Sequence, residues 1–150
     1  MTLFTHGGCA NNHQKLSTRQ MRIVVADETG KVLVEKTLKG GSNNIAELWA
    51  VAEAMLFGKS RAIPEVQIRT NSRNVLAWLD GRIGNNLNDR DAVVNLMDTI
   101  NKLRAHVNID VTWIPKTENL AVHSGRPPLV CLPVLEESGP LSFHCRPIVA

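Results

Sequence analysis

Three side chains of this chain could together bind a metal ion: His6, Glu47 and His123. Imidazole nitrogen suits zinc or copper better than magnesium, and two histidines with one glutamate form the ligand set of some zinc hydrolases. One interpretation is therefore a zinc site. The simpler alternative is that His6 and His123 are ordinary polar residues that bind no metal.

Hydrophobic periodicity and turn residues predict the elements that must position these side chains. The expected strands cover residues 3–5, with an end at Gly7 and Gly8, and residues 19–26, 31–38, 65–70 and 108–114. The expected helices run from about residue 42 to a stop at Gly58, over 72–79 and over 89–104. Trp49, Trp78 and Trp113 fall at inward-facing positions and are expected in the core. This order predicts an α/β fold, with a mixed five-stranded sheet and flanking helices, since strand–helix–strand units pair in parallel.

Four segments carry the polar residues at the ends of these elements. They are Thr5-His6-Gly7-Gly8-Cys9, Asn43-Asn44-Ile45-Ala46-Glu47-Leu48, Thr70-Asn71-Ser72-Arg73-Asn74-Val75-Leu76-Ala77-Trp78, and Trp113-Ile114-Pro115 with Asn119-Leu120-Ala121-Val122-His123. Over about residues 1–124, their order and spacing resemble the type 1 ribonuclease H family. Family members read T-D-G, N-N-x-x-E-L, T-D-S-x-x-V-x-x-W and W-(V/I)-(P/K)…N-x-x-A-D at these places. The resemblance implies a ribonuclease H-like fold, an RNA–DNA hybrid as partner, and Mg²⁺ or Mn²⁺ as cofactor.

The resemblance places His6, Glu47, Asn71 and His123 at the family's four carboxylate positions, and only Glu47 keeps its carboxylate. Hard divalent cations need oxygen ligands that usually carry negative charge. Two metal ions facing one carboxylate are poorly compensated. We therefore expect metal binding through Glu47 to be weak or absent. Without the resemblance, Glu47 could simply be an acid favoured in the first turn of a helix.

The substrate-reading positions that the resemblance implies keep their polar character better. The matching residues are Cys9, Asn12, Asn43, Asn44 and Ser72. Amides suit a 2′-hydroxyl, which both donates and accepts hydrogen bonds. The alternative for Asn43 and Asn44 is a purely structural role as helix caps.

The last 26 residues differ in composition from the rest and hold five of the seven prolines. We expect a ribonuclease H-like domain at 1–124 and an atypical Pro-rich tail at 125–150. The tail could cover the sheet, pair as an edge strand, mediate a homo-oligomer, or be disordered, and an altered reading frame could also explain it. Proline argues against a long helix there.

The whole chain, with 150 residues and 43% hydrophobic composition, has the size and composition of one soluble globular domain. No apolar run is long enough to cross a membrane, so no membrane partner is expected. Three cysteines favour a reducing, cytoplasmic setting. A net charge of +3 permits a nucleic-acid partner without requiring one.

Three functions remain open at this point. The favoured one is a catalytically impaired ribonuclease H-like protein that binds RNA–DNA hybrid or related nucleic acid. The second is an active metal-dependent endonuclease that cleaves the RNA strand of hybrids with altered ligands. The third is a non-catalytic protein-interaction scaffold.

Overall fold

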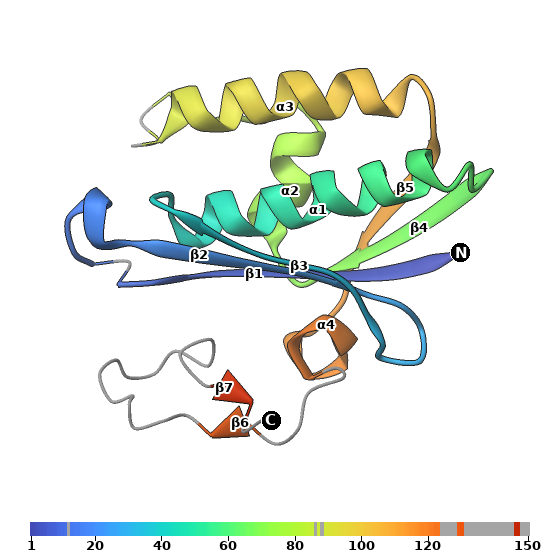
Figure 1. The fold of residues 1–150 in the computed structure, drawn as a ribbon. Helices are drawn as coiled ribbons and strands as arrows, with labels where there is room; N and C mark the ends of the chain where they lie inside the picture. Colours follow the sequence, from blue (N-terminus) through green and yellow to red (C-terminus); the bar gives the residue numbers. More distant parts are fainter. Residues whose placement is uncertain (12, 86, 88, 124–128, 131–145, 148–150) are drawn as a thin grey trace.

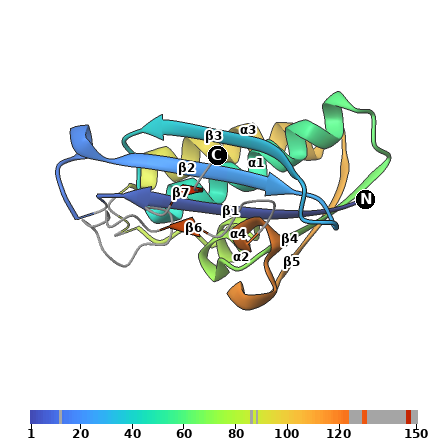
Figure 2. The same ribbon diagram turned by 60° about the horizontal axis from the view of Figure 1, so that its bottom comes forward.

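The chain folds around one five-stranded mixed sheet, which Figures 1 and 2 show from two sides in a computed structural model. The structure describes residues 1–11, 13–85, 87, 89–123, 129–130 and 146–147. The strands are β1 (Thr2–Ala10), β2 (Gln20–Ala26), β3 (Val32–Lys39), β4 (Glu65–Thr70) and β5 (Asn108–Trp113), in the order β3-β2-β1-β4-β5. β1, β2 and β3 form an antiparallel meander, whereas β4 and β5 run parallel to β1. The predicted fold class is confirmed.

Three helices cover one face of the sheet and a fourth lies on the other (Figure 1). They are α1 (Asn43–Ser60), α2 (Arg73–Leu79) and α3 (Arg90–Arg104) on the first face, and the short α4 (Leu120–His123) on the second. Two 3-10 turns, η1 (Leu16–Thr18) and η2 (Lys116–Glu118), interrupt the loops. Both α1 and α2 begin near the carboxyl end of β4. Their first turns therefore lie together at one end of the strands.

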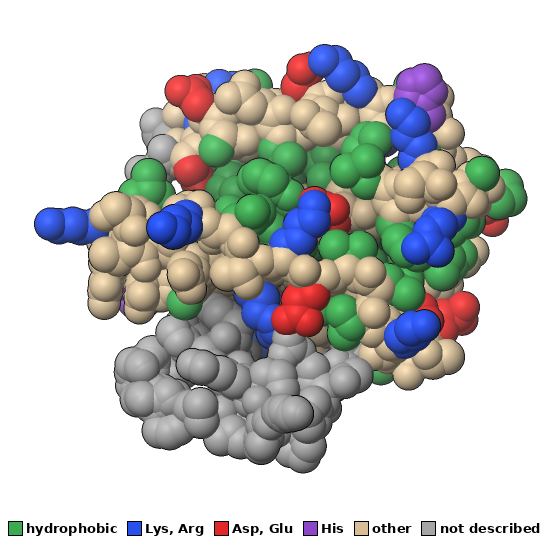
Figure 3. All heavy atoms as spheres, in the orientation of Figure 1, with side chains coloured by type: hydrophobic (Ala, Val, Ile, Leu, Met, Phe, Trp, Pro, Cys, Tyr) green, Lys and Arg blue, Asp and Glu red, His purple; other side chains and the backbone are tan. Residues whose placement is uncertain are grey.

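The core lies between the sheet and α1, because alternate side chains of the strands point to that helix. Leu3, Ile23 and Ile68 from the strands and Leu48 and Met55 from α1 have no exposed surface. Figure 3 shows apolar side chains gathered between α3 and the edge strand β3. Lys and Arg side chains on this face are scattered among acidic ones, which fits a solvated surface better than a phosphate-binding stripe.

The first strand is longer than the sequence predicts. The expected end at Gly7 and Gly8 is wrong, because the strand continues to Ala10 by pairing with β2 from Phe4↔Ala26 to Ala10↔Gln20. Gly7 serves close packing instead of a turn: a Cβ there would lie 2.2 Å from the carbonyl carbon of Ala46 in α1. The helix therefore approaches the strand at its backbone.

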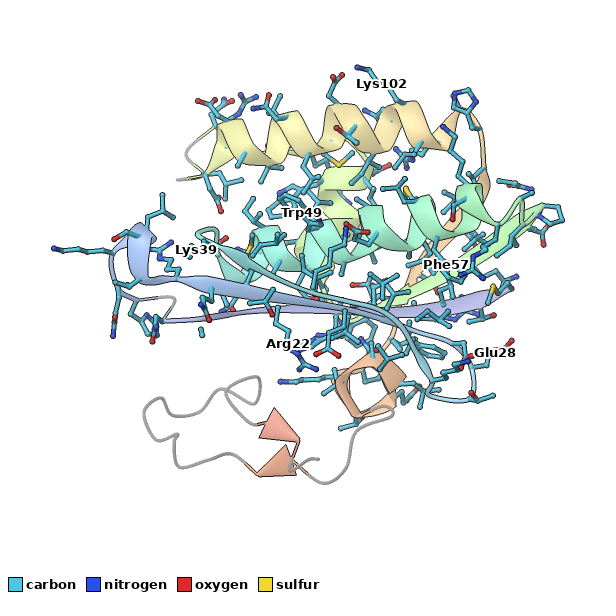
Figure 4. All side chains as sticks on the ribbon, in the orientation of Figure 1. Arg22, Glu28, Lys39, Trp49, Phe57 and Lys102 are labelled. Atoms are coloured by element: carbon cyan, nitrogen blue, oxygen red, sulfur yellow. The ribbon has the colours of Figure 1, made fainter. Side chains whose placement is uncertain are left out.

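Two further predictions about single residues are wrong. Gly58 does not stop the first helix, which runs on to Ser60; a Cβ at Gly58 would lie 2.7 Å from Val66 Cγ2, so the glycine lets α1 sit close to β4. Trp113 is 36% exposed and does not belong to the core. Trp78 is buried as expected, and Trp49 is half-buried on α1 with its indole N–H donating to Glu53 Oε2 (3.2 Å; Figure 4).

The end of the chain contributes little described structure. α4 packs Ala121 against Val24 and Ala26 on the second face of the sheet. β6 (Leu129–Val130) and β7 (Arg146–Pro147) pair with each other in a separate two-stranded sheet, so neither extends an edge of the main sheet. The other expectations for the tail fall on residues outside those described. Among the described residues, no helix is both long enough and apolar enough to span a bilayer.

Candidate functional site

The register of the sheet brings three of the polar segments to one level. Thr5 of β1 pairs with Thr70 of β4, and Thr70 pairs with Trp113 of β5. His6 directly follows Thr5, and Asn71 directly follows Thr70, so both lie where the parallel pairing of β1 and β4 ends. This edge of an α/β sheet is where binding sites usually form, because the chain leaves the strands there and opens a crevice.

The start of α1 supplies Glu47 to the same place. Ser42 caps the helix, with its Oγ accepting from Ile45 N–H (3.2 Å) and donating to Asp89 Oδ2 (2.8 Å). One turn later, Glu47 Oε1 accepts a hydrogen bond from Gly7 N–H (2.8 Å). The contact is possible because Gly7 has no side chain between strand and helix. Only 9% of the surface of Glu47 is exposed.

Burial raises the pKa of Glu47 from its ordinary value of 4.5 to about 7. The hydrogen bond from Gly7 N–H and the positive charge of Lys116 act in the opposite direction and favour the carboxylate. The one acidic side chain of this site therefore keeps its proton to a higher pH than an exposed glutamate does. Its negative charge is weaker than its residue type suggests.

Asn71 ties Glu47 into a network of amide side chains. Asn119 Oδ1 accepts from Ala121 N–H (2.9 Å), and Asn119 Nδ2 donates both to Thr5 O (2.8 Å) and to Asn71 Oδ1 (2.7 Å). Because its oxygen accepts from Asn119, Asn71 presents Nδ2 to Glu47 Oε2, in a long hydrogen bond of 3.5 Å. An amide donor thus stands where the resemblance places a carboxylate oxygen.

His6 also lies against Glu47, with Nδ1 at 3.8 Å from Oε1, and is 8% exposed. The structure therefore brings three of the four predicted positions together: His6, Glu47 and Asn71. His123 ends α4, and its side chain is outside the described part of the chain. The zinc hypothesis for His6, Glu47 and His123 stays untested at that residue.

The described side chains do not fit the divalent cations that the resemblance implies. No group of three or more His, Cys, Asp and Glu within the described ranges could hold a metal ion. Glu47 is the one carboxylate of the network, and the Asn71 oxygen that could replace a lost carboxylate already accepts from Asn119. A hard dication needs several oxygen ligands. It would have to displace Asn71 Nδ2 from Glu47.

An open pocket of about 390 Å³ adjoins this network. Its lining residues are Asn43, Asn44, Glu47, Asn71, Ser72, Arg73, Asn74 and Trp113. The four asparagines and one serine can donate and accept hydrogen bonds without net charge. Arg73 and Glu47 are the ionisable side chains in this lining.

The five predicted substrate-reading residues differ in whether their side chains line the pocket. Asn43 and Asn44 line the pocket: Asn43 Oδ1 accepts from Cys9 N–H (2.7 Å) and Asn44 Oδ1 accepts from Asn74 Nδ2 (3.1 Å). Ser72 lines it too, but its Oγ caps α2 by accepting from Val75 N–H (3.2 Å). The Cys9 thiol is buried in the core, so Cys9 supports Asn43 through its backbone instead of offering a side chain. Asn12 is outside the described residues.

Sequence reasoning missed four residues of this region. Arg73, Asn74 and Trp113 line the pocket, and Asn119 holds Asn71. Trp113 was missed because strand alternation places it inward, although it is the last residue of its strand and turns to the surface. Asn119 stands at the asparagine position of the last family motif, and this match was a signal that could have drawn attention to it, although Val122 replaces the alanine of the motif.

The family model for RNase H matches residues 1–125 of the sequence. The chain belongs to the ribonuclease H family. The match begins at the first residue and runs past the end of α4, so it includes every element of the site. A comparison with curated protein sequences gives no match. The boundary between a domain at 1–124 and a tail at 125–150 stays a prediction.

Solved ribonucleases H share this fold at low sequence identity. The N-terminal RNase H domain of a Mycobacterium tuberculosis protein is 19% identical, with a TM-score of 0.61, over 79% of this chain and 84% of that one. RNase H1 from Halobacterium salinarum is 19% identical, with a TM-score of 0.62, over 80% and 89%. LC11-RNase H1, solved in complex with an RNA/DNA hybrid, is 23% identical, with a TM-score of 0.57, over 79% and 87%.

Proposed function

We propose that this ribonuclease H-family protein binds RNA–DNA hybrid, or a related nucleic acid, and is impaired in cleaving it. The observation that carries the proposal is the Asn119–Asn71–Glu47 network, in which Asn71 Nδ2 points to Glu47 Oε2. Hydrogen bonds satisfy these side chains without a metal ion. Cleavage would require at least one dication to break this network and to gain a single carboxylate in return.

Binding has support that is separate from cleavage. The pocket beside the network keeps Asn43 and Asn44, which the family resemblance assigns to substrate, and both amides are held by neighbours. A held amide loses less conformational entropy when a ligand arrives. LC11-RNase H1, a structure of the same fold, was solved with an RNA/DNA hybrid. We propose the same class of ligand for this chain.

A short labelled hybrid tests both halves of the proposal. Fluorescence anisotropy measures binding in excess EDTA, and a denaturing gel measures cleavage with Mg²⁺, Mn²⁺ or Zn²⁺. We expect salt-sensitive binding and an intact RNA strand. Metal-dependent cleavage that Glu47→Gln abolishes would instead support the active endonuclease with altered ligands.

The scaffold remains the outcome to accept if the chain neither binds nor cleaves the hybrid. A stable oligomer that is lost when residues 125–150 are deleted would then identify the tail as its contact surface. A homo-oligomer through the tail and a cytoplasmic location both stay predictions from the sequence. Size-exclusion chromatography with light scattering checks the first, and imaging of a tagged chain in its host checks the second.

A further inference from the structure

Arg73 contacts an aromatic ring, whereas four other cationic side chains of the described sheet and helices contact acids. Lys36 pairs with Glu53, Arg22 with Glu35, Arg82 with Asp80 and Lys102 with Asp98. No carboxylate of the described chain forms an ion pair with Arg73. Its guanidinium instead lies over the ring of Trp113, with Cζ at 4.1 Å from the ring centroid. Within the described residues, the positive charge of Arg73 is therefore not neutralised by an acidic side chain.

The platform under Arg73 is built by the site itself. Trp113 ends β5, and its indole Nε1–H donates to Asn71 O (3.2 Å). Asn71 thus fixes the tryptophan through its backbone while its side chain donates to Glu47. A guanidinium that stacks on an aromatic ring keeps its N–H donors at the rim of the plane, where they can bind an anion in bidentate fashion.

The pocket around this pair has the charge that an anion requires. Arg73 and Glu47 are its ionisable lining residues, and Glu47 already uses Oε1 for Gly7 N–H and Oε2 for Asn71 Nδ2. Asn44 Oδ1 is engaged by Asn74, so the group that Asn44 can offer a ligand is its amino group, a donor. Donors and one uncompensated cation suit the oxygens of a phosphate better than a cation or an apolar ligand.

We infer that Arg73, stacked on Trp113, binds a backbone phosphate of the nucleic acid in this pocket without a divalent metal ion. The inference rests on the proposed function and names the group that supplies the positive charge there. It assigns Arg73, Trp113 and Asn74 a role in binding that the sequence motifs did not suggest. One consequence is that hybrid binding should persist in EDTA and should not require Mg²⁺.

Arg61 provides a matched control for this inference. Its Cζ lies 4.7 Å from the ring centroid of Phe57, so it forms the same kind of cation–π contact. Arg61 follows the last residue of α1, whereas Asn43 and Asn44, which line the pocket, begin that helix. Figure 4 shows Phe57 near the C-terminal end of α1. Arg61→Gln removes one surface charge and one stacked guanidinium without touching the pocket.

The experiment measures anisotropy of labelled hybrid, single-stranded RNA, single-stranded DNA and duplex DNA of one sequence, in excess EDTA and in Mg²⁺. We expect Arg73→Gln to weaken binding of the probe that the native chain binds most tightly, by about tenfold or more. The slope of log K against log salt concentration should fall in magnitude by about one. Trp113→Phe should weaken binding less, since it keeps the ring and loses the bond to Asn71. Arg61→Gln should stay within about twofold of the native chain after the same charge loss.

Two results would overturn the inference. One is an Arg73→Gln variant that folds, by its melting temperature, and binds as tightly as the native chain. The other is native binding that disappears in EDTA. In the first case the chain still binds hybrid, so the proposed function stands while the role of Arg73 fails. If the chain cleaves hybrid in Mg²⁺ while its binding in EDTA depends on Arg73, the role of Arg73 stands and the proposed impairment of cleavage fails. If the chain binds none of the four probes, the proposed function and the role of Arg73 are both refuted.

Discussion

Replacing Glu47 by glutamine should remove a pH dependence of stability that the buried carboxyl imposes on the fold. Burial raises its pKa from 4.5 to about 7, so the folded chain holds this proton more tightly than the unfolded chain does. Stability is then greatest below about pH 4.5 and falls as the pH rises towards 7 and slightly above it. At about 1.4 kcal/mol per pH unit, the full loss is about 3 kcal/mol.

The change expected between pH 5 and pH 8 is about 2–3 kcal/mol, because part of the loss has already occurred at pH 5. Glutamine stays neutral, and its amide oxygen can accept the hydrogen bond that Gly7 N–H gives to Glu47 Oε1. The difference in unfolding free energy between Glu47→Gln and the native chain should therefore shift by this amount in favour of the variant. At any single pH, this difference also includes a cost of about 1 kcal/mol to the variant, because Glu47→Gln loses the hydrogen bond from Asn71 Nδ2.

Urea unfolding at several pH values between 5 and 8 measures this shift. Glu53→Gln is the control, because Glu53 is a buried acid on the same helix that forms an ion pair with Lys36 (2.8 Å). A constant difference between Glu47→Gln and the native chain across this range would refute the reasoning. It would mean that Glu47 is charged in the folded protein well below neutrality, and the case against metal binding would weaken.

Three further substitutions test the network around Glu47. Asn71→Asp should place a second carboxylate beside Glu47 and lower stability at pH 8 by about 1–3 kcal/mol. Mn²⁺ should then raise the melting temperature of this variant, and a melting temperature that does not respond to Mn²⁺ would contradict the prediction. Asn119→Ala removes the bonds to Thr5 O and Asn71 Oδ1 and should cost about 2–3 kcal/mol in urea unfolding, whereas a loss below about 0.5 kcal/mol would show that the network does not hold the site. Gly7→Ala should cost about 3 kcal/mol or more, because its Cβ meets the backbone of Ala46, and native-like stability would disprove that approach.

The sequence predicted the order and position of the elements well because each has its own periodicity. Residues 65–70 and 89–104 alternate or repeat with the periods of a strand and a helix, and β4 and α3 match them within a residue. The main errors in where elements end occurred at glycines. Gly7 and Gly58 read as breaks in a one-dimensional pattern, yet both are places where α1 and a strand approach each other too closely for a Cβ.

The site was only partly predictable, for a physical reason. Motif spacing identified His6, Glu47 and Asn71 as neighbours, but the direction of the Asn71 amide depends on Asn119, which is 48 residues away in sequence. The stacking of Arg73 on Trp113 likewise joins the start of α2 to the end of β5. Contacts between distant segments leave no local pattern, so the structure was needed to find them.

The net charge of +3 matches the number of carboxylates that the site lacks relative to the family motifs. Three of the four positions at which the resemblance places a carboxylate are asparagine or histidine here, and three more carboxylates would bring the net charge to zero. The mildly basic character therefore coincides with the loss of acids at the site. It does not require an added basic surface, and the scattered Lys and Arg side chains of Figure 3 agree with this.

Single-turnover cleavage of an end-labelled RNA–DNA hybrid, with protein in excess and saturating by anisotropy, tests the central claim most directly. The account predicts that the hybrid is bound in EDTA, Mg²⁺ and Mn²⁺ alike and that its RNA strand stays intact in all three. Metal-dependent cleavage by the native chain that is lost in Glu47→Gln would contradict it, since the hydrogen-bonded network would then have to open and hold a catalytic metal ion.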